Sequence, residues 1–499
     1  MSDSRSTLRA AAWAFGATAG TRLITIVALV VLARLLAPRD FGLLAFALVY
    51  FTYAETIGDL GTTAALIYWP DRREDAAQIT FWVNLAMGAA WFAVTIAIAP
   101  LVARFFDNPG AAPIVRVLAI GFLIKFLGNT HDALAQKDLR FRARAVPELG
   151  LAATKAGVSI ALAAAGLGVW SLVWGHLVGL TVWTAAAWAI VPWRPRASLP
   201  RDLIAPMVRY GRGIVGVNAI AAVVHHADLV VVGRMIGATA LGLYQVASKI
   251  PEATVTVVVW VAAKVLFPAF SKLQGSVEHL RRAYLKALAW VSLVTVPMAA
   301  GLFVAAEPLI LALFGPKWSG AVPLLRWLAI YAGIRSIGTH AGDVLKATGR
   351  SGLLASLGLI KAAILVPALI AAGRLGAEAV AMTLAIVTFM TSLLNIAIVR
   401  RILRFSLADV VRSVRTSLAA GAALVAAGVP LVRLTAGLDP SASLAIVIAA
   451  CAIVYGAVAF ALDRASFAEI ASALSTGERP GPTIEPMPPS TPSSTEVEP

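Results

Sequence analysis

The sequence predicts an all-α polytopic membrane protein of about 14 transmembrane helices, and three observations support this fold class. Hydrophobic residues make up 59% of the 499 positions and charged residues only 14%, so the mean hydropathy is +0.83. Apolar runs of about 20 residues, the length of a helix that crosses a bilayer, recur along the chain. The two halves also repeat one residue pattern. We therefore expect two parallel six-helix lobes around a central cavity, plus two extra C-terminal helices.

The composition argues against other classes of protein. Soluble globular chains are about 45–50% apolar, so this chain needs lipid as its solvent. The net charge of +16 does not indicate nucleic-acid binding, because the cations lie in short loops and not on one basic domain. Cys451 is the single cysteine, and no Cys/His cluster has the spacing of a metal site. We expect no metal, no cofactor and no nucleic-acid partner.

Fourteen apolar runs qualify as spans. They cover residues 11–33, 41–67, 78–100, 113–135, 147–167, 169–191, 212–236, 241–268, 284–305, 320–346, 352–372, 376–400, 416–434 and 441–462. The first run extends too far for a cleaved signal peptide, so we expect the chain to begin in the cytoplasm. The segments then assigned to the cytoplasm hold 25 Lys and Arg residues, against nine in the opposite loops. This bias predicts that both termini are cytoplasmic.

An internal repeat relates the two halves of the chain. The segment that begins at Ala33 returns 200 residues later, with Arg34 and Gly42 matched by Arg234 and Gly242. The glycines are expected to ease the turns between spans, and the arginines to lie at the membrane interface. We divide the chain into residues 1–200 (N-terminal six-helix lobe), 201–405 (C-terminal six-helix lobe), 406–465 (two additional transmembrane helices) and 466–499 (a cytoplasmic region ending in a disordered Pro/Ser/Glu tail).

Five cations lie near the middle of predicted spans: Arg22, Lys125, Lys155, Arg335 and Lys361. The repeat aligns Lys125 with Arg335, and Lys155 with Lys361. The same register aligns Arg140 with Arg350. At the bilayer centre the set would cost on the order of 12–17 kcal/mol, which is comparable to the stability of a whole domain, roughly 5–15 kcal/mol. These side chains must therefore line a hydrated cavity or pair with acids. A cavity with a positive lining would take an anion, and phosphate is the natural candidate.

Acids and histidines also lie inside the predicted spans. The candidates for ion coupling or charge pairing are Glu55, Asp59, His225, Asp228, His340 and Asp343. They form three pairs with spacings of three or four residues, so each pair shares one helical face. A His beside an acid titrates near physiological pH, which would allow proton coupling. Alternatively, the acids only neutralise the deep cations and the histidines only form hydrogen bonds inside the bundle.

The order of these features resembles a known family. The segments that carry the resemblance are RLLAPRDFGLLAFA at Arg34–Ala47, QKDLRFRAR at Gln136–Arg144, DLVVVGRMIGATALGLYQVASKIPE at Asp228–Glu252 and LFGPKWSGAVPLLRWLA at Leu313–Ala329. Together with the six-plus-six repeat, they resemble the Wzx-type polysaccharide (O-antigen) flippases, the lipopolysaccharide biosynthesis proteins of the multidrug/oligosaccharidyl-lipid/polysaccharide exporter superfamily. The similarity covers nearly the whole chain apart from the tail.

The resemblance implies a transporter and not an enzyme. It would flip polyprenyl-diphosphate-linked oligosaccharide from the cytoplasmic to the periplasmic leaflet of the bacterial inner membrane by alternating access, for O-antigen, capsule or exopolysaccharide synthesis. The family has a cationic cavity to which an Arg of the first span contributes, and Arg22 matches it by position. The expected partners are membrane lipid, the lipid-linked cargo, H+ or Na+, and a polysaccharide polymerase or glycosyltransferase. The protein is expected to be a monomer.

Two other functions compete with this interpretation. A drug or organic-cation antiporter of the same superfamily would need an acidic cavity, whereas the deep charges here are cationic on balance. An integral-membrane polymerase or ligase of lipid-linked glycans would need a carboxylate–metal cluster or a large extramembrane loop. The longest connections between the predicted spans are about twenty residues long and contain no clustered acids.

Overall fold

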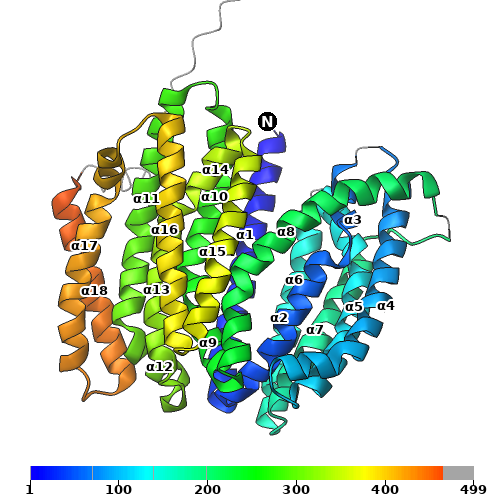
Figure 1. The fold of residues 1–499 in the computed structure, drawn as a ribbon, viewed down its shortest axis with the longest axis horizontal. Helices are drawn as coiled ribbons and strands as arrows, with labels where there is room; N and C mark the ends of the chain where they lie inside the picture. Colours follow the sequence, from blue (N-terminus) through cyan, green and yellow to red (C-terminus); the bar gives the residue numbers. More distant parts are fainter. Residues whose placement is uncertain (1, 70, 139, 198, 465–499) are drawn as a thin grey trace, which may run out of the picture.

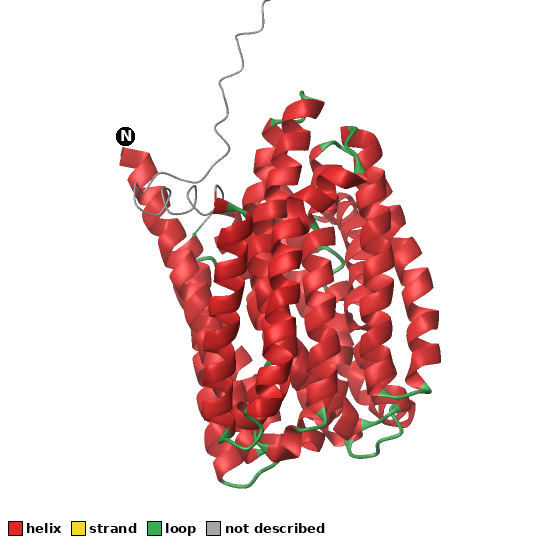
Figure 2. Ribbon diagram, turned by 90° about the vertical axis from the view of Figure 1, so that its left-hand side faces the viewer, coloured by secondary structure: helices red, strands yellow, loops and turns green. Residues whose placement is uncertain are grey.

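The computed structural model describes residues 2–69, 71–138, 140–197 and 199–464, and every regular element in these ranges is a helix (Figures 1 and 2). The first lobe contains α1 (Ser2–Leu35), α2 (Pro38–Gly58), α3 (Thr62–Tyr68), α4 (Arg73–Phe105), α5 (Ala111–Lys137), α6 (Phe141–Ala164) and α7 (Val169–Ile190). The second contains α8 (Arg201–Met235), α9 (Ala238–Pro251), the π-helix η1 (Glu252–Thr256), α10 (Val257–Lys272), α11 (Val277–Val304), α12 (Ala306–Phe314), the 3-10 helix η2 (Pro316–Trp318), α13 (Ala321–Gly338), α14 (His340–Ala347), α15 (Ser351–Gly373) and α16 (Ala377–Leu403). The chain continues with α17 (Leu407–Leu434) and α18 (Pro440–Leu462), and the predicted tail at 466–499 lies outside the described residues.

The structure confirms the all-α membrane fold class. Within the described part of the chain, twelve helices are long and apolar enough to cross a membrane. The predicted spans 11–33 and 320–346 fall on α1 and on α13–α14, which are not among these twelve, so the count of fourteen stays a prediction. Three predicted spans are interrupted helices, because α2 breaks before α3, α9 continues into α10 through η1, and α13 is followed by α14.

Packing partners repeat between the two lobes, as the duplication predicts. α1 packs on α6 as α8 packs on α15, and α4 packs on α5 as α11 packs on α13. Arg140 and Arg350, which the repeat aligns, stand at the N-caps of α6 and α15. α17 and α18 pack on α11 and α12 at the left edge of Figure 1 as an appended pair. The contacts agree with two six-helix lobes and two extra helices, while the boundaries at 200, 405 and 465 stay predictions.

The lobes meet where α2 crosses α9, near the lower end of the molecule in Figure 1. A Cβ atom on Gly42 would lie 1.7 Å from the carbonyl oxygen of Ala238, and one on Gly242 would lie 1.8 Å from that of Pro38. Only glycine allows two helix backbones to approach this closely. The expectation that these glycines ease turns is therefore wrong. They lie inside two helices, at the crossing that joins the lobes.

Side chains of each lobe bind the helix-end carbonyls of the other lobe beside this crossing. Arg34, in the last turn of α1, donates from Nε to the carbonyl oxygen of Leu313 at 2.9 Å and from Nη2 to the preceding carbonyl. In return, Lys317 donates to the carbonyl of Arg34 and the Trp318 indole donates to that of Ala33, both at 2.8 Å. The last carbonyls of a helix lack partners within the helix, so cations and N–H donors are favourable there. We call Arg34, Lys317 and Trp318 the interlobe latch.

α8 links the lobes at the opposite end. It packs on α2, α3 and α4 of the first lobe and on α15 and α16 of the second, and Figure 1 shows it crossing the molecule diagonally. A Cβ on Gly61 would lie 2.4 Å from the Cα of Gly211, so α8 lies directly on the break between α2 and α3. At the start of α8, the Asp202 carboxylate accepts a hydrogen bond from the Arg72 guanidinium, which holds the pKa of Arg72 above its ordinary value.

We expect Gly42→Ala to destabilise the protein by at least about 1–3 kcal/mol, because the added methyl group would overlap the carbonyl of Ala238. Thermal unfolding of the purified protein in detergent measures this loss. The matched control is Gly157→Ala on α6, where a Cβ would meet nothing within 4 Å. Equal melting temperatures for the two variants would show that the crossing tolerates a side chain.

We expect the double substitution Arg34→Ala and Lys317→Ala to loosen the contact between lobes, because both sets of helix-end carbonyls lose their donors. Spin labels at the exposed, repeat-equivalent positions Arg39 and Thr239 report the distance between the starts of α2 and α9. The distance distribution should broaden toward longer values. It should not change with Arg374→Ala, an exposed arginine away from the latch. An unchanged distribution in the double variant would refute a role for the latch in holding the lobes together.

Candidate functional site

A cavity of about 800 Å³ lies between the two lobes. Its walls come from α1, α2, α3 and α5 of the first lobe and from α8, α9, η1, α10, α13 and α16 of the second. The volume is within the range of ligand pockets, roughly 300–1,000 Å³. On α2 the lining begins at Thr52, about three turns past Gly42. The α2–α9 crossing therefore closes one end of the cavity.

The cavity brings together seven of the eleven residues that the sequence predicts for the site. They are Arg22, Lys125 and Arg335, with Glu55, Asp59, His225 and Asp228. These residues are spread over five helices and both lobes. The sequence analysis selected them by their depth in the predicted spans and by the repeat, and the structure brings them together in one cavity.

The other four predicted residues are not among the lining residues. Lys361 lies on α15, with its Nζ 3.4 Å from the hydroxyl of Thr388 on α16. His340 and Asp343 lie on α14, where the His340 Nδ1 and an Asp343 oxygen are 3.1 Å apart. Lys155 lies on α6, where its Cβ faces Gly179 of α7. The repeat pairing of Lys155 with Lys361 therefore does not translate into a second pair of cavity cations in this conformation.

The described lining does not have the expected excess of cations. Its cations are Arg22, Lys125, Lys249 and Arg335, and its carboxylates are Glu55, Asp59, Asp132, Asp228 and Glu252. The sequence analysis did not select Lys249, Asp132 or Glu252 for the site. The net formal charge of the wall therefore does not indicate which kind of ligand the cavity binds. That depends on which charged groups are already paired within the protein.

Two of the five carboxylates pair with lysines of the lining. Glu55 Oε1 on α2 lies 3.1 Å from Lys125 Nζ on α5, and Lys125 also lies 5.8 Å from the ring centre of Trp183. Glu252 Oε2 lies 2.8 Å from Lys249 Nζ, one turn earlier on the same helix. The second pair is about half exposed, so it contributes little to stability. Each pair nevertheless neutralises one lysine.

The other three carboxylates also have partners in the protein. Asp132 pairs with Arg144 of α6 through two contacts of 2.9 and 3.1 Å. Asp59 accepts two backbone N–H groups, at 2.9 and 3.3 Å, where α2 breaks before α3. Asp228 accepts the Tyr244 hydroxyl at 2.8 Å. Each of the five acids thus has a partner in the protein, which for Glu55 is the ion pair with Lys125.

Arg22 and Arg335 are lining cations for which the described residues provide no carboxylate. Arg22 is exposed on α1, in the first lobe. Arg335 lies on α13, in the second lobe, and donates from Nη1 to the Tyr331 hydroxyl at 3.3 Å. A guanidinium presents a planar fork of donors that matches phosphate oxygens in two-point contacts. The cavity therefore offers two arginines, one from each lobe, to an anionic ligand.

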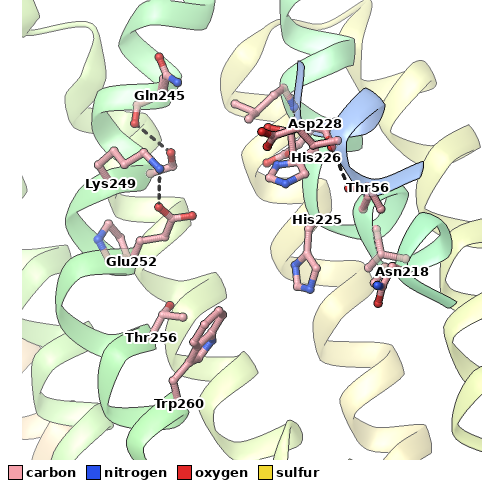
Figure 3. Close-up of a pocket in the computed structure, with 18 of the residues that line it drawn as sticks. Thr56, Asn218, His225, His226, Asp228, Gln245, Lys249, Glu252, Thr256 and Trp260 are labelled. Carbon is pink, nitrogen blue, oxygen red and sulfur yellow. Dashed lines mark hydrogen bonds and ion pairs between the residues drawn. The ribbon is translucent and has the colours of Figure 1, made fainter. Parts of the chain in front are cut away.

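A stripe of polar side chains runs along the α9–α10 wall (Figure 3). Its members are Gln245, Ser248, Lys249, Glu252, Thr256 and Trp260, which are spaced by one to four residues along the helix. Pro251 lacks the N–H that would close a regular turn, and the helix passes through the π-turn of η1 at this point. Sequence reasoning missed most of this wall, although the helical spacing of its polar residues was the available signal.

The histidines of α8 also face the cavity. The rings of His225 and His226 lie 6.5 Å apart, and His226 lies 6.2 Å from the ring of Tyr53 on α2. The predicted pairing of His225 with Asp228 is not formed by a hydrogen bond between described atoms, because the Asp228 oxygens accept Tyr244 and the backbone N–H of Leu229.

Comparison with known proteins finds relatives whose names refer to polysaccharide biosynthesis. The chain is 27% identical over 390 residues to the lipopolysaccharide biosynthesis protein WzxC of Escherichia coli (strain K12), which covers 77% of this chain and 78% of that one. It is 27% identical over 360 residues to the succinoglycan biosynthesis transport protein ExoT of Rhizobium meliloti (strain 1021), covering 72% and 73%.

Solved structures share the fold at low sequence identity. The lipid II flippase MurJ, in an inward closed conformation, superimposes with a TM-score of 0.76 at 13% identity, covering 90% of this chain and 98% of that one. An inward-facing multidrug resistance transporter of the MATE family and MOP superfamily gives a TM-score of 0.65 at 16% identity, covering 77% and 94%. The model of one protein family matches residues 31–323, more than half of the chain. The chain therefore belongs to the polysaccharide biosynthesis protein family.

Proposed function

We propose that this protein flips a polyprenyl-diphosphate-linked oligosaccharide from the cytoplasmic to the periplasmic leaflet of a bacterial inner membrane. One observation carries the proposal: Arg22 and Arg335, from opposite lobes, face a cavity of about 800 Å³ and have no carboxylate partner among the described residues. The names of the relatives, a lipopolysaccharide biosynthesis protein and a succinoglycan transport protein, support a saccharide cargo. The product would supply O-antigen, capsule or exopolysaccharide synthesis.

The diphosphate is the part of the cargo that these arginines would bind. Charge-assisted bonds between guanidinium and phosphate are about twice as strong as neutral ones, and they strengthen where water is excluded. A ligand held by both arginines bridges the two lobes, which couples its binding to their relative position. In this conformation Lys125 serves mainly as the partner of Glu55. Lys155 and Lys361 make no contact with cargo in this arrangement.

Movement follows from the way the lobes are joined. The α2–α9 crossing and the interlobe latch close the end of the cavity opposite the N-terminus in Figure 1. With both termini cytoplasmic, as the Lys and Arg bias predicts, this closed end is periplasmic. The lobes rock so that the cavity opens alternately to the two sides, while the prenyl chain stays in lipid. No covalent bond is made or broken, so the protein is a transporter and not an enzyme.

Ion coupling would use titratable groups that line the cavity. Glu55, Asp59, His225 and Asp228 are in position to exchange H+ or bind Na+, whereas His340 and Asp343 lie on α14 away from the lining. A polysaccharide polymerase or glycosyltransferase would act before or after this step on the same lipid-linked cargo. The protein itself works as a monomer, since both lobes of the cavity come from one chain.

An organic-cation antiporter is the second candidate, because five carboxylates line the cavity. Each of them already has a partner in the protein, which leaves none available to a cationic drug without breaking an existing bond. The nature of the cargo that crosses a reconstituted membrane separates this candidate from the flippase.

We expect Arg22→Ala and Arg335→Ala each to lower transport by tenfold or more. Loss of one charged hydrogen bond costs about 1.5–3 kcal/mol, and tenfold corresponds to about 1.4 kcal/mol. Purified protein in vesicles, with a fluorescent polyprenyl-diphosphate oligosaccharide, allows the cargo in each leaflet to be measured with a membrane-impermeant quencher. Surface polysaccharide in cells should fall in parallel, at unchanged protein level.

The matched control is Arg433→Ala, which removes an exposed arginine at the end of α17, outside the cavity lining. It should transport normally. Normal transport by both Arg22→Ala and Arg335→Ala would show that these arginines are not needed for transport. Movement of an organic cation, without movement of the lipid-linked cargo, would favour the antiporter.

The Lys125–Glu55 pair can be separated from the cargo contacts by a double-mutant cycle. Lys125→Gln leaves a carboxylate inside the membrane without its partner, so we expect less folded protein, by about 1–3 kcal/mol of stability. Adding Glu55→Gln should restore both the protein level and transport. If the double variant folds but does not transport, Lys125 contacts the cargo directly, as the sequence predicts.

A further inference from the structure

Trp260 is a large aromatic side chain whose exposure the proposed diphosphate site does not explain. It lies on α10, lines the cavity and is 58% exposed. Figure 3 shows it at one end of the polar stripe, beyond Thr256 and Glu252, with its ring directed toward the space between α10 and α8. The indole N–H makes no hydrogen bond with the described residues. An exposed Trp of this size normally indicates a membrane interface or a ligand.

The position of Trp260 argues against the membrane interface. The continuous helix from Ala238 to Lys272 has 35 residues, so it is roughly 52 Å long, and Trp260 lies about 8 Å from its midpoint. The hydrocarbon core extends about 15 Å to each side of the bilayer centre. Interfacial aromatic belts lie at the ends of this region. Trp260 is therefore at the depth of the cavity and on its face, away from the headgroup region.

The wall opposite Trp260 carries polar side chains for which the described residues provide no hydrogen-bond partner. Asn218 and His225 lie on α8, seven residues apart and hence on one helical face, and both line the cavity. The Asn218 side chain is exposed and makes no hydrogen bond with the described residues. Figure 3 shows Asn218 and His225 on the side of the cavity that faces Thr256 and Trp260. The amide can donate and accept hydrogen bonds at once.

An aromatic face opposite an amide fits a carbohydrate ring. The C–H groups on one face of a pyranose pack on an aromatic ring, while its equatorial hydroxyls need donors and acceptors around its edge. The charged groups closest along the stripe, Lys249 and Glu252, already pair with each other at 2.8 Å. This end of the cavity therefore suits a neutral, hydroxyl-rich group better than a diphosphate.

We propose that Trp260, Thr256 and Asn218 form a saccharide subsite, in which one pyranose ring of the glycan stacks on the indole. This inference rests on the proposed function, because it assigns the sugar of the same cargo. Two separate parts of the cavity then bind the two parts of the cargo. The arginines Arg22 and Arg335 bind the diphosphate, and the α10–α8 wall binds the glycan. Selectivity among glycans would depend on this wall.

Binding to three probes tests the subsite with the purified full-length protein. The probes are a polyprenyl diphosphate that carries a tetrasaccharide, the same lipid without sugar, and the free tetrasaccharide. Trp260→Ala should weaken binding of the sugar-bearing lipid by roughly threefold to tenfold, and leave binding of the bare lipid unchanged. Trp260→Phe should lose less, because it keeps an aromatic face. Trp174→Ala is the control, since Trp174 is 43% exposed on α7 but does not line the cavity.

The outcomes separate this subsite from the proposed function. Equal losses for both lipids in Trp260→Ala, or a wild-type protein that does not prefer the sugar-bearing lipid, would overturn the subsite while the flippase proposal stands. If the wild-type protein binds neither lipid, the proposed function fails. Binding of the free tetrasaccharide to the wild-type protein and to Trp260→Ala then tests the subsite by itself. Binding of that sugar that is lost in Trp260→Ala would still support the subsite, and no such binding would overturn it.

Discussion

The backbone contact between α2 and α9 sets the distance between the lobes, and the cavity depends on that distance. The carbonyl oxygens of Pro38 and Ala238 occupy the places where Cβ atoms of Gly242 and Gly42 would otherwise lie. No other residue permits this approach. The latch residues Arg34, Lys317 and Trp318 then donate hydrogen bonds to backbone carbonyls at the helix ends beside the crossing. One end of the cavity is thereby closed with backbone groups of both lobes.

The low dielectric of a membrane protein makes the pairing of charges more informative than their number. Five carboxylates and four cations line the cavity, so a count alone would suggest a nearly neutral or acidic site. Each acid, however, has a lysine, an arginine, a hydroxyl or backbone N–H groups within hydrogen-bonding range. An unpaired charge is expensive in this environment and becomes favourable only when a ligand pairs with it. Arg22 and Arg335 are in that position, and this makes the cavity suitable for an anion.

Much of the fold was predictable because the signals are local. Apolar runs located the helices, and the repeat register predicted equivalent positions such as Arg140 and Arg350, which cap equivalent helices. The site was predictable only in part. Depth within a span selected Arg22, Lys125 and Arg335, which the structure places in the lining, but it also selected Lys155 and Lys361, which are not in the lining. Depth does not determine the direction in which a side chain points around its helix.

The sequence by itself determined the membrane fold class, the duplication and the family resemblance. The length of apolar runs and the order of residues are properties of the chain that do not depend on how it folds. Only the tertiary structure decided which charges remain unpaired and which glycines are in contact. Glu55 meets Lys125 across two helices, and Gly42 packs against the start of α9 two hundred residues later. Such contacts depend on the rotation and spacing of packed helices. Those quantities are set by the packing of the whole bundle and cannot be read from any one segment.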